Sequence, residues 1–155
     1  MINREEAIIL INRYIKNIEL IRQSFAVEAI LKELAKKLKK DELLWSLTGL
    51  LYNLDYEYTS SELEKRGILS SKLLYGLLPE NAINAIMSNN FTHTNVIPTT
   101  ALDKALISSD AVKDLIFITA RSVPSKKLED VDFNTLFNGF IDNFILKLKI
   151  LTRVK

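Results

Sequence analysis

The chain has 155 residues, of which 48% are apolar and 26% charged, a composition typical of a single globular domain rather than of a disordered segment. Its 21 basic and 19 acidic residues leave a net charge of +2, which is too small to indicate a nucleic-acid or membrane surface. The chain has no cysteine and one histidine, His93, so disulfides, thiolate zinc sites, thiol nucleophiles and sites with two imidazoles are excluded.

The first third of the chain is predicted to form three helices. Asn3, with Glu6 three residues later, is typical of a capped helix start. A second helical pattern runs from about residue 19 to 38, and Asp41 can cap a third that continues to residue 51. The cluster Lys36, Lys37, Lys39 and Lys40 lies at the end of the second helix, where cations complement the helix dipole. The alternative is a patch that binds an anion or a partner.

The middle of the chain alternates breaks with helical patterns. Residues 54–58 indicate a turn, and Thr59 to Ser61 are expected to start a helix that Gly67 loosens. Pro79 fits the first position of a helix that runs to about residue 87. Residues 88–98 are polar and carry no period, so we expect a loop with His93 on its surface. A long helix is predicted over residues 100–121.

The clearest apolar pattern lies in the last helix, expected at about residues 132–150 after the break at Pro124. Its apolar residues recur at steps of three and four: Phe133, Leu136, Phe137, Phe140, Ile141, Phe144, Ile145 and Leu148. Such a stripe docks either on the chain's own core or on a second copy as a dimer seam. With four glycines, three prolines and few strand signals, the sequence predicts one all-α domain over residues 1–155.

No targeting or membrane segment is expected. The N-terminus lacks a basic region followed by an apolar stretch, and no apolar run approaches the length of a membrane span. We therefore expect a cytoplasmic protein that binds neither nucleic acid nor membrane.

Two stretches, Ala26–Ile30 and residues 43–57 (LLWSLTGLLYNLDYE), carry the most distinctive pattern. They resemble the HD-domain phosphohydrolase superfamily, in its branch of small single-domain proteins, where the second stretch reads approximately LWGLAGLLHDxDYE. The similarity continues in the family's order through residues 67–69, 102–106, 109–110 and 124–128. It implies a helical bundle of the HD-domain type with a metal site at its centre.

The resemblance also shows what this chain lacks. The family's first ligand histidine falls at Gln23, and its His-Asp pair falls at Tyr52 and Asn53. Its two further histidines fall at Arg66 and Asn89. The family's last aspartate is kept as Asp110, and the aspartate two residues after the pair is kept as Asp55.

The family's hydrolysis depends on a metal-bound hydroxide, and these replacements are poor ligands for a transition metal. We therefore expect no bound metal, no cofactor and no catalytic residues at these positions. The replacements are either random losses or a coordinated change in which the Arg66 guanidinium pairs with Asp110 or Asp55, directly or through water. In the second case Gln23, Tyr52 and Asn53 would supply neutral hydrogen bonds to the same network.

Three functions follow from the resemblance. The first is a catalytically inactive HD-fold protein that binds a ligand or a protein partner. The second is a metal-dependent phosphohydrolase with an altered, oxygen-rich site of Asp55, Asp110 and Glu57. The third is a structural subunit whose centre is filled by its own side chains. A small anionic ligand would be bound by Arg66, Lys126 and Lys127, with Asp55 nearby, and the protein is expected to be a monomer or a homodimer.

Overall fold

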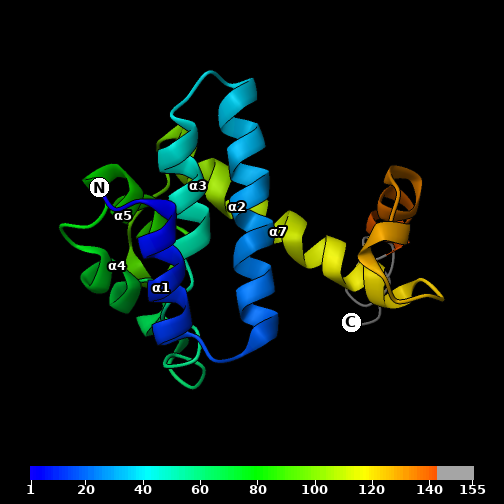
Figure 1. Cartoon of the computed structure of the whole chain (residues 1–155), viewed down its shortest axis with the longest axis horizontal. Coiled ribbons are helices and arrows are strands. Elements are labelled where there is room, and N and C mark those ends of the chain that lie inside the picture. Colours follow the sequence, from blue (N-terminus) through cyan, green and yellow to red (C-terminus); the bar gives the residue numbers. More distant parts are fainter. Residues whose placement is uncertain (143–155) are drawn as a thin grey trace, which may run out of the picture. The chain divides into compact units, whose positions relative to one another are not determined.

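A computed structural model describes residues 1–142, and every regular element in that part of the chain is a helix (Figure 1). In chain order they are α1 (Arg4–Tyr14), α2 (Ile18–Lys37), α3 (Glu42–Leu51), η1 (Leu63–Lys65), α4 (Ile68–Leu74), α5 (Glu80–Ser88), α6 (Phe91–Thr94), α7 (Ala101–Ser122) and η2 (Leu128–Asp130). Residues 133–142 form a further helix. The all-α prediction is thus confirmed. None of the described helices is both long and apolar enough to cross a bilayer.

The contacts within the chain divide it into two compact units. The N-terminal unit comprises Met1–Asp110, and the C-terminal unit begins at Ala111, so the boundary falls within α7. The predictions of a single domain and of an HD-type bundle are not tested by this division.

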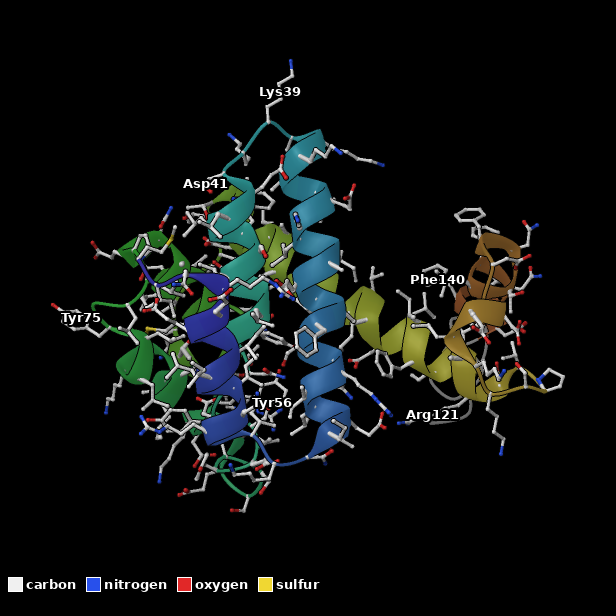
Figure 2. The ribbon with its side chains drawn as sticks, in the orientation of Figure 1. Lys39, Asp41, Tyr56, Tyr75, Arg121 and Phe140 are labelled. Atoms are coloured by element: carbon white, nitrogen blue, oxygen red, sulfur yellow. The ribbon has the colours of Figure 1, made fainter. Side chains whose placement is uncertain are left out.

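Capping residues set several helix boundaries where the sequence predicts them. Asn3 and Glu6 form a reciprocal capping box at the start of α1, with distances of 2.8 and 2.9 Å. The side chain of Asp41 accepts a hydrogen bond from the backbone N–H of Leu44 and so begins α3 (Figure 2). Pro79 lies one position earlier than predicted, because it precedes the first helical residue of α5. These ends are local, so sequence alone identifies them well.

The prediction of one helical stretch that starts at Thr59 to Ser61 and continues through a loosening Gly67 is wrong. Turns continue to Ser61, the short η1 follows, and α4 begins only after Gly67. Gly67 has a φ of +85°, which a residue with a side chain rarely adopts. A Cβ there would also lie 3.0 Å from the carbonyl oxygen of Ile86. Gly67 is therefore a sharp corner before α4 rather than a weak point inside a helix. The predicted loop over residues 88–98 also contains the one-turn helix α6.

The core of the N-terminal unit is built around α3, which packs most extensively on α2 and also contacts α1 and α5 (Figure 1). Gly49 of α3 allows the close approach to α2. A Cβ at Gly49 would lie 2.9 Å from the carbonyl oxygen of Val27 and 2.9 Å from Cδ1 of Leu31. Fully or almost fully buried apolar side chains surround this contact: Ala7, Ile11, Ile15, Val27, Leu31, Leu47, Leu50, Leu51, Leu54, Leu74, Ile86 and Leu106.

A buried carboxylate links α1, α2 and α3. Glu28 of α2 is 6% exposed and accepts two hydrogen bonds from Arg4, at 2.6 and 3.0 Å. The hydroxyl of Ser46 donates a third at 3.0 Å. The hydrogen bonds and charge of Glu28 raise the pKa of Arg4. Since a buried charge needs such partners, this contact fixes the helices in register.

The expected aromatic stripe of the last helix lies partly within the described residues. Phe133, Phe137 and Phe140 are 76%, 52% and 50% exposed. Docking on the chain's own core and a dimer seam therefore both stay predictions for this stripe. Phe144, Ile145 and Leu148 of the same pattern lie outside the described residues.

Candidate functional site

Asp110 of α7 lies beside two other positions that the resemblance aligns with ligands of the family. The hydroxyl of Tyr52, at the C-terminal end of α3, donates to Oδ1 of Asp110 over 2.6 Å. The side-chain amide of Asn89, at the C-terminal end of α5, donates to Oδ2 over 3.3 Å. The fold thus brings together three residues from three helices that the resemblance places in one site. Both oxygens of this carboxylate accept hydrogen bonds from the protein.

Asp55, the second retained aspartate, has a mainly structural set of contacts. It is fully buried, and its Oδ2 accepts hydrogen bonds from the backbone N–H groups of Gly67, at 2.8 Å, and Ser70, at 3.0 Å. The backbone N–H of Asp55 in turn donates to the hydroxyl of Ser70 over 3.1 Å. Asp55 therefore fastens the turn after α3 to the start of α4. Among the described residues its other oxygen, Oδ1, has no hydrogen-bond partner.

Arg66 does not form the direct ion pair that was expected. Its guanidinium lies over the ring of Tyr56, 4.0 Å from the ring centroid, and forms no ion pair with Asp55 or Asp110 within the described part of the chain. A cation over an aromatic face gains electrostatic stabilisation without a carboxylate. The ring centroids of Tyr56 and Tyr52 are 5.7 Å apart, with the rings edge to face. Arg66 is therefore connected to the residues around Asp110 by two contacts with aromatic rings.

Tyr56 is the residue of this cluster that the sequence analysis missed. Burial, followed by the negative charge of Asp110, raises the pKa of Tyr56 well above its usual range, and the nearby charge of Arg66 opposes the shift. Tyr56 is thus a neutral phenol at physiological pH. No spacing signal could have identified it, because it lies in the turn after α3, where helical periodicity ends.

The remaining predicted positions are divided between the two units. Asn53 is fully buried, and its Oδ1 accepts a hydrogen bond from the hydroxyl of Ser24 over 2.7 Å, whereas its Nδ2 has no partner among the described residues. Gln23 is half-buried on α2. Lys126 and Lys127 are exposed in the C-terminal unit, and Lys127 pairs with Glu129 over 3.2 Å.

His93 is exposed on α6, where its Nδ1 lies 2.9 Å from Oδ1 of Asn90 and 3.1 Å from the hydroxyl of Thr92. This agrees with the surface position that the sequence predicts. The nearest interactions of His93 are therefore local to its own helix, and none connects it to the cluster around Asp110.

The chemistry of this cluster is that of a hydrogen-bonded network. In residues 1–142 no three or more histidine or carboxylate side chains converge as a metal site would require. Its aspartates instead accept hydrogen bonds from a phenol, an amide and backbone N–H groups.

Comparisons of the chain with protein-family profiles, with curated proteins and with solved structures find no match. The assignment to the HD-domain superfamily therefore depends on the sequence resemblance alone.

Proposed function

We propose that this protein is a non-catalytic, HD-like helical module that acts by binding a partner or a small anion. The main support is the use of the two retained aspartates. Asp110 accepts hydrogen bonds from Tyr52 and Asn89, and Asp55 accepts them from the backbone of Gly67 and Ser70. An ion at Asp110 or at Oδ2 of Asp55 would have to compete with these protein hydrogen bonds.

The chemistry of a small ligand would be set by Arg66. Its Nε is buried without a hydrogen-bond partner among the described residues, although its guanidinium is held on Tyr56. A guanidinium donates strongly to phosphate and carboxylate oxygens, so an oxyanion would satisfy this atom. In the alternative, the cluster around Asp110 and Asp55 only stabilises the fold, and the protein binds its partner through another part of its surface.

The test compares the purified protein and its Asp110→Ala variant for metal content and for phosphatase activity with Mg²⁺, Mn²⁺, Co²⁺ or Zn²⁺. We expect no stoichiometric metal and no turnover above background that depends on Asp110. About one transition-metal ion per chain, or turnover abolished by Asp110→Ala, would support the altered hydrolase instead. The unpartnered Oδ1 of Asp55 is the observation that favours this second candidate.

The ligand chemistry is tested with inorganic phosphate as the probe. We expect phosphate to raise the thermal stability of the wild-type protein and not that of Arg66→Met. Arg22→Met is the matched control, because Arg22 is an exposed arginine of the same unit that pairs with Glu19. An equal phosphate effect in all three proteins would exclude Arg66 as the anion ligand.

A further inference from the structure

A dense group of lysines lies where α2 ends and the chain turns into α3. These exposed lysines of α2 and of the connection after it are named here the Lys tip: Lys32, Lys36, Lys37, Lys39 and Lys40. In the part of the chain that the structure describes, none of their ammonium groups forms an ion pair or a hydrogen bond. Together they carry more than the whole net charge of +2, so the rest of the chain is net negative. Positive charge concentrated in one place steers anionic partners towards it.

The dipole of α2 explains only part of the Lys tip. Lys36 and Lys37 lie in the last turn of α2, where a cation stabilises the end of the helix. This effect falls off within one turn, whereas Lys32 lies further back in the helix. Lys39 and Lys40 follow the helix and belong to the connection. The stability of α2 therefore does not account for the whole group of charges.

Lys39 has a backbone conformation that favours glycine. Its φ is +54°, in the left-handed region. Its N–H donates to the carbonyl of Lys36 over 3.3 Å, and the N–H of Lys40 donates to that of Ala35 over 2.8 Å. Glycine usually follows a helix that ends in this way, because a Cβ is strained there. A lysine at this position costs the turn stability and points to a use of its side chain, which extends away from the helices in Figure 2.

Other side chains near the Lys tip indicate what kind of anion it fits. Leu38 and Leu43 are 51% and 47% exposed, so a partner with apolar side chains would gain contacts here. Asp41 and Glu42 would repel a continuous array of phosphates, such as a nucleic acid or an anionic bilayer, whereas the carboxylates of a peptide can be spaced to avoid them. Residues 32–43 also contain no arginine, the side chain best suited to bidentate phosphate binding.

We propose that the Lys tip is a docking surface for an acidic segment of a partner protein. Carboxylates of this segment pair with the lysines, and its apolar side chains cover Leu38 and Leu43. Backbone hydrogen bonds at the end of α2 and the Asp41 cap of α3 fix the connection between the two helices. The surface is therefore formed before the partner arrives, and binding does not have to order it.

Fluorescence anisotropy of the full chain with a fluorescein-labelled peptide of glutamates and interspersed leucines tests the proposal. We expect a Kd on the order of tens of micromolar at low salt, because the contact is small and largely electrostatic. A peptide with glutamine for every glutamate, and one with serine for every leucine, should each bind at least about threefold more weakly. No binding of the acidic peptide up to about 300 µM, or undiminished binding of either substituted peptide, would overturn the proposal. Tighter binding of phosphatidylserine vesicles or of double-stranded DNA would overturn it as well.

Charge reversal at the Lys tip is compared with the same reversal elsewhere on the N-terminal unit. Lys39→Glu combined with Lys40→Glu should weaken binding of the acidic peptide at least about tenfold. Lys16→Glu combined with Lys72→Glu is the matched control, because it changes the net charge equally at two exposed lysines of the same unit. Equal weakening by the two pairs would show that the peptide responds only to net charge, and the proposal would fail.

Lys39→Gly separates the use of this side chain from its effect on the fold. Glycine relieves the left-handed strain, so the variant should unfold at a higher temperature than the wild-type protein while its affinity for the peptide falls at least about threefold. Lower thermal stability or unchanged affinity would contradict the argument. Figure 2 shows Lys39 well apart from Tyr56, the ring that carries Arg66. These variants leave Arg66 and Asp110 intact, so failure of this proposal would leave the proposed function untouched.

Discussion

Removing the hydroxyl of Tyr52 is the sharpest test of the idea that Asp110 has a structural partner in place of a metal ion. Tyr52 is 2% exposed, and its hydroxyl donates to Asp110 over 2.6 Å. In Tyr52→Phe the buried ring is kept, while the hydroxyl that donates to Asp110 is lost. Hydrogen bonds to charged groups typically contribute about 1.5–3 kcal/mol. Because Asn89 still donates to the other carboxylate oxygen, we expect a loss of about 2 kcal/mol in the free energy of unfolding.

A double-mutant cycle separates this contact from other effects of the substitutions. Asp110→Asn keeps an oxygen acceptor but removes the charge, so it weakens the same hydrogen bond. We expect the double variant to be more stable than the sum of the two single effects predicts, with a coupling energy of about 1 kcal/mol or more. Urea denaturation followed by circular dichroism measures each corner of the cycle.

The control for the cycle is Tyr58→Phe, because Tyr58 is 58% exposed in the turn after α3. We expect this variant to unfold within about 0.5 kcal/mol of the wild-type protein. If Tyr52→Phe is equally neutral, or if its effect is unchanged in the Asp110→Asn background, the hydrogen bond does not hold the centre together and the reasoning is refuted.

Three further predictions concern the N-terminal unit. Gly49→Ala should lower the free energy of unfolding by about 1–3 kcal/mol in urea denaturation, because its Cβ would lie 2.9 Å from the backbone oxygen of Val27. This loss is expected although alanine favours helices more than glycine does. An unchanged denaturation midpoint would contradict the close approach of α2 and α3. Asp41→Ala removes the cap of α3 and should cost about 1 kcal/mol by the same assay, whereas a neutral result would show that the cap is dispensable. Burial raises the pKa of Tyr56 in the folded state, so the folded protein holds this proton more tightly than the unfolded chain; stability should be constant up to about pH 10 and fall above it. Thermal unfolding of Tyr56→Phe between about pH 8 and 11 should show a smaller decline than the wild-type protein, and equal declines would contradict the shift.

The sequence by itself determined the helical class and most helix boundaries. These features depend on neighbours within one or two turns, such as the box of Asn3 with Glu6 and the cap at Asp41. The excluded chemistries also followed directly, because a site with two imidazoles or a thiolate cannot be built without those residues. Helix caps and the residue types that are present can both be identified from the sequence of a single chain.

Other features depended on tertiary structure. Gly67 was misread as a loosened helix because its role depends on the Ile86 carbonyl, which lies 19 positions away in the sequence. The Arg66 guanidinium was expected on a carboxylate, yet it lies on Tyr56, because the turn after α3 brings that ring within reach. Only the folded chain decided these contacts, since each joins segments whose spacing in sequence carries no period.

The aromatic stripe of the last helix also separates what helical spacing predicts from what packing decides. Its spacing predicts correctly that Phe133, Phe137 and Phe140 share one face, because that follows from the pitch of a helix. Whether such a face is covered depends on packing between distant parts of the chain. Periodicity therefore determined the face, whereas packing, which joins distant parts of the chain, decided its environment.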